Sequence, residues 1–369
     1  MLPRIISPTE VTWPSGGSLY NHQIAAQWAI HVEPMPGAWP TPSQRNLQQL
    51  TDRLIGDPAD RGRPILLDGL IGCAAPQAIV AARAAGARVV LLVHLPLPAE
   101  TGASRSQVAG LARAEQHALT AAEAVACTSH WAAADLRRRY GVTGITVAEP
   151  GVVAAPPATG SDPPVFITPA VFSARKNHAL LLRAFADAQI ADLDWSALWV
   201  GAEPAPGARR AVQQQVAMAG LADRIDVKAA VTGSQLDALY ARSNLLLLPS
   251  LAETYAMVVT EAFARGIPAV VGAGTGAAAT LAARRDNGRG HRDLPGGNPP
   301  GRDGAESGLP GTAVGLEDPR VWAQTLRSWL TDRSLRATWR EAAMTRREDQ
   351  PTWADAAHTL IRVMQSKGA

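Results

Sequence analysis

Short apolar runs alternate with amphipathic segments along most of the chain. Uninterrupted apolar runs of this length are typical of strands that are buried on both faces of a parallel sheet. In the first half, the pattern predicts strands at Pro64–Asp68, Arg88–Leu95, Ala124–Thr128 and Ile145–Ala148. Ala- and Arg-rich stretches between them predict helices at Pro76–Ala85, Ser104–Ala122 and Trp131–Tyr140. Repeated strand–helix units favour right-handed crossovers and one parallel sheet.

The same alternation restarts in the second half, after a segment rich in Pro and Gly at residues 154–164 that we interpret as a linker. Strands are predicted at Val165–Thr168, Ala197–Gly201, Ile225–Lys228, Asn244–Leu248 and Pro268–Val271. Helices are predicted at Asn177–Gln189, Ala208–Ala219, Ser234–Ala241 and Tyr255–Arg265. We therefore expect an α/β fold of two Rossmann-like, doubly wound domains that face a cleft, at residues 1–160 and 161–345. A C-terminal helix within 346–369 is expected to pack back toward the N-terminal domain.

Two later segments depart from this pattern. Residues 284–311 are dense in Gly, Pro and charge, and they predict a surface loop. Helices resume at Pro319–Leu330 and continue to the end. Four tryptophans are the expected packing anchors there: Trp322, Trp329, Trp339 and Trp353.

Composition narrows the class of protein. Hydrophobic residues make up 47% of the 369 residues and charged residues 18%, which is enough apolar material for two cores. A formal charge of +3 without a dense basic block argues against a nucleic-acid partner and allows at most peripheral contact with a membrane. Cys73 and Cys127 lie in apolar stretches and are expected to be buried free thiols. With no signal-peptide pattern at the start, a cytoplasmic location is expected.

The segment from Asn244 to Gly272 carries the most chemistry. A buried strand ends at Pro249, a short loop holds Ser250 and Glu253, and a helix is predicted from about Thr254 to Arg265. Ligands of open parallel sheets bind beyond the carboxyl ends of the strands. Glu253 and Glu261 are eight residues apart, so on one helix they would face roughly the same side. Two such carboxylates suit the vicinal hydroxyls of a sugar or a ribose, although each alone also fits an ordinary helix glutamate, with Glu261 paired to Arg265.

This segment, LPSLAETYAMVVTEAFARGIPAVVG, resembles the donor-binding signature of retaining glycosyltransferases of family 4 (glycosyl transferases group 1), which have the GT-B fold. The resemblance implies that Glu253 contacts hydroxyls of the transferred sugar and that Glu261 binds the ribose. It also implies that backbone amides at Tyr255, Ala256 and Met257 hold the donor. The family usually has Gly where this chain has Ala256.

Three further segments resemble the same family. The first, PSGGSLYNHQIAAQW, places Gly16 and Gly17 before a predicted helix, where glycines would let the backbone approach a diphosphate. The second, VFITPAVFSARKNHALLLRAFADA, places Lys176, with Arg175, beside the leaving diphosphate. A further upstream Arg of many members is replaced here by residues 169–171, Pro-Ala-Val. The third, VVLLVHLPLP, implies that His94 faces the donor sugar. A plain turn, a solvated basic pair and a strand-end histidine are the respective alternatives.

The resemblance implies a retaining, metal-independent enzyme. It would move a hexose, of mannose or glucose type, from a UDP- or GDP-sugar to an unidentified acceptor (a glycan, a lipid or a small molecule), with no cofactor. The pair Asp192 and Asp194 matches the Asp-x-Asp pattern of metal-dependent transferases. Because it precedes a predicted strand, we interpret it as a surface turn.

Other functions remain open from the sequence. The run AVVGAGTGAAATL places Gly272, Gly274 and Ala277 after a strand, which resembles the dinucleotide-binding pattern of an NAD(P)-dependent oxidoreductase. The same run stands where family members often have Gly-Gly-x-Pro-Glu. A nucleotide-sugar epimerase or a glycoside phosphorylase of the same fold, and an inactive sugar-binding scaffold, are the further alternatives.

Overall fold

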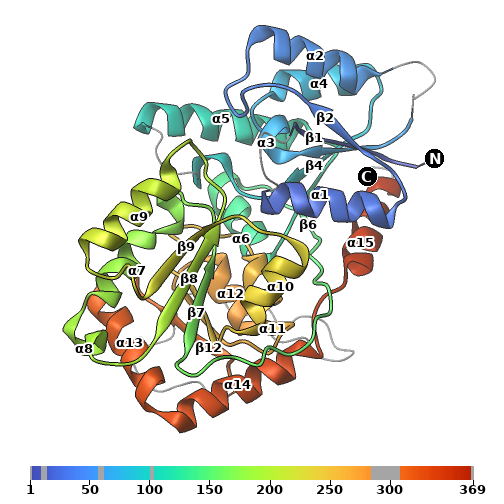
Figure 1. Ribbon diagram of the computed structural model, residues 1–369. Coiled ribbons are helices and arrows are strands. Elements are labelled where there is room, and N and C mark those ends of the chain that lie inside the picture. Colours follow the sequence, from blue (N-terminus) through green and yellow to red (C-terminus); the bar gives the residue numbers. More distant parts are fainter. Residues whose placement is uncertain (1, 10–14, 57–61, 100–103, 284–307, 367–369) are drawn as a thin grey trace. The chain divides into compact units, whose positions relative to one another are not determined.

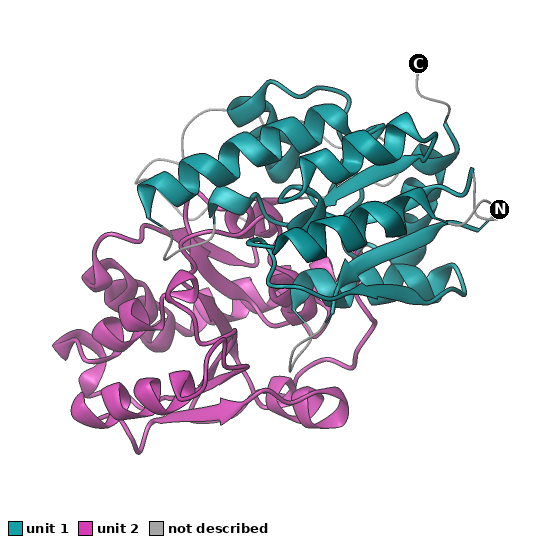
Figure 2. Cartoon of the chain, turned by 90° about the horizontal axis from the view of Figure 1, so that it is seen from above, with its two compact units in different colours: residues 1–151, 351–369 teal, residues 152–350 magenta. Residues whose placement is uncertain are grey.

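The computed structural model describes residues 2–9, 15–56, 62–99, 104–283 and 308–366. The chain divides into two compact units, which Figure 2 colours separately. Unit 1 comprises Met1–Gly151 and Pro351–Ala369, and unit 2 comprises Val152–Gln350. Unit 2 therefore begins at residue 152, before the predicted boundary at 160/161. It ends at residue 350, after the predicted boundary at 345/346.

Unit 1 is built on a six-stranded parallel sheet with the order β2-β1-β3-β4-β5-β6. Figure 1 labels four of these strands: β1, β2, β4 and β6. Its strands are β1 (Arg4–Pro8), β2 (Val32–Met35), β3 (Ile65–Asp68), β4 (Val89–Val93), β5 (Ala124–Cys127) and β6 (Thr146–Val147). Four of the six were predicted. β1 and β2 were not, because Arg4 and Glu33 interrupt their apolar pattern. In the fold these two side chains neutralise each other, with Arg4 Nε and Nη2 at 2.7 and 2.6 Å from the Glu33 carboxylate.

The helices of unit 1 are α1 (Gly16–Gln27), α2 (Gln44–Ile55), α3 (Gly69–Gly72), α4 (Pro76–Ala84), α5 (Arg105–Ala121), α6 (His130–Tyr140) and α15 (Trp353–Gln365), with a 3-10 turn η2 (Leu97–Ala99). α15 returns from the end of the chain and packs against α1, β5 and β6. The Trp353 ring meets the edge of Tyr20 with centroids 5.4 Å apart. The Tyr20 hydroxyl donates to the carbonyl of Ala148 at 2.9 Å, so α1 is tied to the end of the last strand.

Unit 2 has a second six-stranded parallel sheet, with the order β12-β11-β10-β7-β8-β9. Its strands are β7 (Val165–Pro169), β8 (Ser196–Gly201), β9 (Ile225–Ala229), β10 (Leu245–Leu248), β11 (Ala269–Gly272) and β12 (Gly311–Val314). The predicted loop at 284–311 lies outside the described residues up to 307. Its last residue, Gly311, begins β12 instead and pairs with Ala269.

The helical elements of unit 2 are η3 (Ala174–Lys176), α7 (His178–Phe185), α8 (Ala188–Ala191), α9 (Ala208–Met218), α10 (Gly233–Ala241), α11 (Met257–Phe263), α12 (Gly276–Ala282), α13 (Pro319–Thr331) and α14 (Arg333–Arg347). The prediction of one helix over Asn177–Gln189 was wrong. Asp187 caps a new helix there, because its carboxylate accepts from the Gln189 amide at 2.9 Å.

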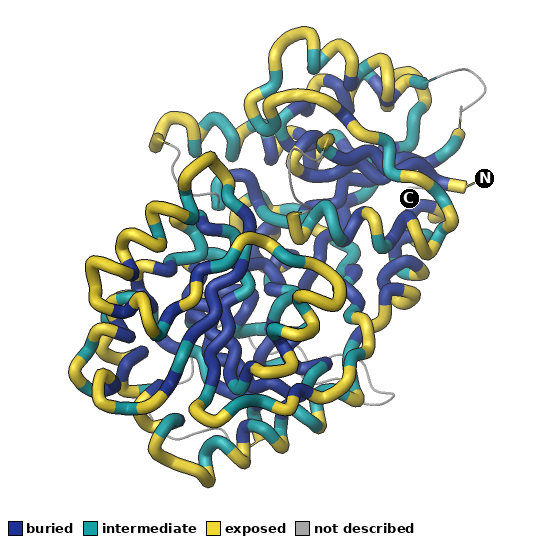
Figure 3. Tube along the Cα trace, in the orientation of Figure 1, coloured by how far each residue is buried: buried dark blue, intermediate teal, exposed yellow. Residues whose placement is uncertain are grey.

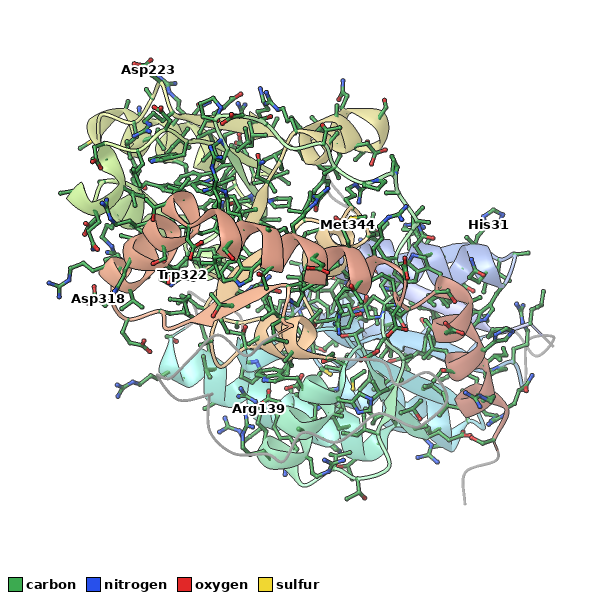
Figure 4. All side chains as sticks on the ribbon, turned by 90° about the horizontal axis from the view of Figure 1, so that it is seen from below. His31, Arg139, Asp223, Asp318, Trp322 and Met344 are labelled. Carbon is green, nitrogen blue, oxygen red and sulfur yellow. The ribbon has the colours of Figure 1, made fainter. Side chains whose placement is uncertain are left out.

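The inner strands of each sheet are buried on both faces, as the dark blue segments in Figure 3 show, whereas the outer strands β2, β6 and β9 are partly exposed. In β10, Leu245 and Leu247 enter one apolar cluster, whereas Leu246 and Leu248 enter another. Trp322, Trp329 and Trp339 are buried in the first of these, and Trp353 is buried in unit 1, so the predicted packing anchors are confirmed (Trp322 on α13 is labelled in Figure 4). Cys73 and Cys127 are buried free thiols, as expected. None of the described helices combines the length and the apolar character that crossing a membrane requires.

Candidate donor-binding site

Two loops of unit 2 meet at the carboxyl ends of the neighbouring strands β7 and β10. The first loop contains η3 with Arg175 and Lys176, and the second contains Glu253. The amide of Leu251 donates to the carbonyl of Arg175 at 2.8 Å, and Nη1 of Arg175 donates to the carbonyl of Ala252 at 2.9 Å. These bonds fix the backbone of one loop against the other, in the position where open parallel sheets bind ligands.

The central contact of the site is the ion pair of Lys176 and Glu253. Nζ of Lys176 lies 2.5 Å from Oε1 of Glu253, and Nη1 of Arg175 lies 3.6 Å from the same oxygen. Burial alone would raise the pKa of Glu253, which is 7% exposed, but the charges of Lys176 and Arg175 outweigh it and hold the pKa below its usual value. The carboxylate is therefore ionised at neutral pH. Lys176 and Arg175 thus place two positive charges beside one carboxylate at this edge of the sheet.

Helix α12 holds the Glu253 loop from the other side. The Gly276 amide donates to the carbonyl of Glu253 at 2.7 Å, and the Thr280 hydroxyl donates to the carbonyl of Tyr255. A Cβ on Gly276 would stand 2.7 Å from the Glu253 carbonyl oxygen and closer still to Thr254. Gly276 therefore permits a backbone contact that no other residue allows. The sequence did not predict this role of Gly276, although the residue lies in the run GAGTG at 272–276.

Two glycines of that run, Gly272 and Gly276, pack against the loop that contains Glu253. A Cβ on Gly272 would stand 2.9 Å from the carbonyl oxygen of Ser250. Gly272 and Gly276 are thus both explained by close approach to residues 250–254. Gly274, the middle glycine of the run, has φ of 73° and no atom within 4 Å of an added Cβ, so it is explained by its backbone conformation rather than by packing.

The helix after the Glu253 loop begins later than predicted. α11 starts at Met257 instead of about Thr254, because Ala256 adopts a left-handed conformation with φ of 70°. Glu253 lies in the loop, as predicted, but four residues before the helix begins, so the expectation that Glu253 and Glu261 share one face of a single helix was wrong. Ala256 occupies the position where the resembling family usually has glycine, the residue that adopts this conformation without strain.

Glu261 lies on α11 in a second polar cluster. The Tyr240 hydroxyl on α10 donates to its Oε2 at 2.9 Å. Burial raises the pKa of Glu261, and the hydrogen bond from Tyr240 and the charge of Arg265 oppose that shift. The alternative pairing of Arg265 with the Glu261 carboxylate is not found. Arg265 pairs with Asp237, and it reaches only the backbone carbonyl of Glu261, at 3.0 Å.

A separate polar cluster surrounds His94 in unit 1. Nδ2 of Asn21 donates to Oδ2 of Asp68 at 2.6 Å and to Oγ of Ser7 at 3.0 Å. Oδ1 of Asn21 therefore faces Nε2 of His94, at 3.1 Å, and this bond requires the imidazole proton on Nε2. Burial lowers the pKa of His94 against the opposing charge of Asp68, so the ring is mainly neutral at pH 7. Asn21 and Asp68 were not singled out from the sequence.

The two N-terminal glycines lie inside the first turn of α1, not before the helix as predicted. Ser15 is the N-cap, and its hydroxyl accepts from the amide of Ser18 at 3.1 Å. A Cβ on Gly17 would stand 2.9 Å from Cδ2 of His94, so glycine is needed there to admit the imidazole. Asp192 and Asp194 are exposed and precede β8, as expected for a surface turn. Within the described ranges, no three His, Cys, Asp or Glu side chains gather as ligands for a metal ion.

The matched family covers the loops just described. Residues 154–289 match the model of the family Glycosyl transferases group 1. Arg175, Lys176, Glu253 and Glu261 all lie within this segment. The D-inositol 3-phosphate glycosyltransferase of Salinispora arenicola is 34% identical over 124 residues, which are 34% of this chain and only 22% of that protein. Most of the segment of unit 2 that carries these loops is therefore similar to the group 1 glycosyltransferases.

Solved structures resemble the chain over nearly its whole length. Sucrose-phosphate synthase from Thermosynechococcus elongatus has a TM-score of 0.75 at 19% identity, covering 98% of this chain and 97% of that one. Anabaena HepE in complex with UDP and glucose has a TM-score of 0.72 at 16% identity, covering 100% of both chains. The expected fold is confirmed by these similarities. It is GT-B, with two parallel-sheet α/β domains.

Proposed function

We propose that the chain is a retaining glycosyltransferase that moves a hexose, of mannose or glucose type, from a nucleoside diphosphate sugar to an unidentified acceptor, without a metal or a further cofactor. One observation carries the proposal most directly. Buried Glu253 is ion-paired with Lys176 and lies near Arg175, at the carboxyl ends of β7 and β10 and within the segment that matches the glycosyltransferase model.

The residues of this cluster suit the parts of such a donor. Lys176 and Arg175 supply positive charge for the diphosphate, which becomes a better leaving group when its charge is balanced. The ionised carboxylate of Glu253 accepts hydrogen bonds from hydroxyls of the transferred sugar. The amides at Tyr255, Ala256 and Met257 would hold donor oxygens, and Glu261 would bind the ribose.

The proposed transfer needs no enzyme nucleophile. The acceptor oxygen forms a bond to the anomeric carbon on the face from which the diphosphate departs, as the bond from that carbon to the phosphate oxygen breaks. The leaving phosphate oxygen takes the acceptor proton, so the atoms and charges balance and the anomeric configuration is retained. The rate would come from positioning and from stabilisation of the leaving group.

The donor is proposed to be a UDP- or GDP-sugar. Anabaena HepE has been solved with UDP and glucose, and this supports a uridine nucleotide as the first to test. We place the reaction in the cytoplasm, where such donors would be met. The predicted contact of His94 with the transferred sugar stays a prediction.

A panel of nucleoside diphosphates and nucleotide sugars, tested by thermal shift, checks donor binding. A ligand at about 100 times its dissociation constant adds roughly 2.7 kcal/mol to the free energy of unfolding. We expect UDP or GDP and one matching sugar nucleotide to raise Tm. Stabilisation by NADH alone would instead favour the oxidoreductase alternative.

Donor hydrolysis with Glu253→Gln tests turnover. We expect kcat to fall about 100-fold, as is typical when one polar contact to a reacting group is removed, with nucleotide affinity nearly unchanged. Glu203→Gln is the matched control, because Glu203 is a partly exposed carboxylate of the same unit that pairs with Arg209 at 2.9 Å. Equal turnover in both variants would contradict the proposal. EDTA should leave the rate unchanged, and a loss reversed by Mn²⁺ would refute metal independence.

A further inference from the structure

Tyr240 is a buried tyrosine whose hydroxyl makes a hydrogen bond to the carboxylate of Glu261. The side chain is completely buried in the apolar cluster formed with α11 and β10. Its hydroxyl donates to Oε2 of Glu261 at 2.9 Å. A phenylalanine would fill the same volume without placing a polar group in the core, where an unpartnered hydroxyl is unfavourable. The hydroxyl is therefore best explained by the carboxylate it meets.

Arg265 and Asp237 complete the support of this tyrosine. The Arg265 guanidinium lies over the Tyr240 ring, 4.6 Å from its centroid. It pairs with Asp237 on α10 and donates to the Glu261 carbonyl at 3.0 Å, so one cation bridges α10 and α11. Arg265 thereby holds both the Tyr240 ring and the Glu261 backbone in place. A side chain in this setting has few rotamers left to lose on binding a ligand.

The two carboxylate oxygens of Glu261 have different surroundings. Its Oε2 accepts from Tyr240, whereas its Oε1 has no hydrogen bond to any part of the chain that the structure describes. Glu261 is only partly buried, so this oxygen is accessible to a ligand. Fixing Oε2 sets the direction in which Oε1 presents its lone pairs.

We infer that Tyr240 is a positioning residue that orients Glu261 toward the ribose hydroxyls of the donor nucleotide, and that it thereby sets the preference for ribonucleotides over nucleotides lacking those hydroxyls. This inference rests on the proposed function, because it takes Glu261 as the ribose contact. Tyr240 itself touches no ligand. Its effect on binding should therefore disappear when either the ribose hydroxyls or the Glu261 carboxylate is removed.

Isothermal titration calorimetry with UDP and GDP, and with their 2′,3′-dideoxy forms, tests this. For the nucleotide that binds the wild-type protein, we expect Tyr240→Phe to raise Kd roughly five- to tenfold, as the loss of one hydrogen bond would. The Kd of the dideoxy form should change less than about twofold. In a Glu261→Ala background, Tyr240→Phe should have little further effect on either ligand.

Tyr140→Phe is the matched control. Tyr140 is a tyrosine of unit 1 whose hydroxyl donates to a buried glutamate, Glu115, at 2.6 Å. The Tyr140→Phe variant should bind the nucleotide and its dideoxy form with unchanged affinity.

For each variant, the Kd of the nucleotide is compared with the Kd of its dideoxy form. A general loss of stability would change both Kd values alike and leave their ratio unchanged. An equal loss for both sugar forms in Tyr240→Phe would overturn the inference and leave the proposed function intact. Failure of UDP and GDP to bind the wild-type protein would overturn the proposed function itself, and this inference with it.

Discussion

Replacing Gly276 with alanine should displace Glu253 without changing any side chain of the donor site. The added methyl group would stand 2.7 Å from the Glu253 carbonyl oxygen, whereas ordinary contacts begin at 3.4 Å. The Thr254 carbonyl oxygen would be closer still, at 2.1 Å, and the groups are backbone on both sides, so relief requires a shift of the loop by about 1.3 Å. The same shift would stretch the hydrogen bond from the Gly276 amide to the Glu253 carbonyl, now 2.7 Å long.

The kinetic consequence follows from the geometry of positioning. A misplacement of about 1 Å at a reacting group can cost roughly 100-fold in rate. We expect Gly276→Ala to lower kcat for donor hydrolysis by about 10- to 100-fold. Nucleotide affinity should fall much less, because Glu261 lies on α11 and is held by Tyr240 rather than by α12.

Donor hydrolysis at saturating sugar nucleotide, with UDP or GDP binding measured in parallel, separates these effects. Gly110→Ala is the control, because Gly110 lies within α5 with nothing within 4 Å of an added Cβ, and alanine there should stabilise the helix slightly. Both variants are assayed well below their Tm values. If Gly276→Ala is folded and turns over donor within twofold of wild type, the contact of α12 with the Glu253 loop does not position a carboxylate that turnover depends on.

Three further outcomes are expected. Lys176→Met should lower the free energy of unfolding at pH 7 by about 3 kcal/mol, because it leaves buried Glu253 without its closest cation. The lowered pKa of Glu253 gives stability that is present above the unfolded carboxyl pKa and is lost as pH falls through the folded value. Urea titrations should therefore show the difference between Lys176→Met and wild type shrinking at pH 3.5, and a constant difference would refute this. Ala256→Gly should relieve the left-handed strain at φ 70° and change unfolding free energy by no more than about 1 kcal/mol, with donor binding retained; a loss of binding would contradict it. Gly17→Ala should displace His94 and lower turnover about tenfold with nucleotide affinity intact, and unchanged turnover would argue against a role for His94.

The strands that the sequence predicted can be recognised from their own residues, because most of them contain a continuous apolar run. Val89–Val93 and Leu245–Leu248 are apolar at every position because both faces of the sheet are covered. β1 and β2 escaped prediction since each contains a charge, and only the fold reveals that Arg4 and Glu33 lie beside each other, 29 residues apart. An ion pair between residues so far apart in sequence produces no periodic pattern of apolar and polar residues from which it could be predicted.

The candidate site divides in the same way. Lys176, Glu253 and Glu261 were accessible from motifs because each stands in a local pattern with its neighbours. Asn21, Asp68, Gly276 and Tyr240 were not, because each acts through a residue that is distant in sequence. Tyr240 is 21 residues from Glu261, and Asn21 is 73 from His94. The start of α11 was predicted too early for a local reason, since a left-handed alanine is rare and only close contacts around it reveal that conformation.

The two glutamates of unit 2 are held by different devices, and this makes their roles separable. Glu253 is fixed through its backbone, by the α12 amide on one side and by the loop after β7 on the other, and its carboxylate is charged because cations face it. Glu261 is fixed through its side chain, by the hydroxyl of Tyr240. Changes in glycine packing should therefore act on turnover, and changes in the α10–α11 polar cluster should act on nucleotide affinity. A variant of Gly276 that weakened nucleotide binding as strongly as Tyr240→Phe would show that the two devices are coupled through α11.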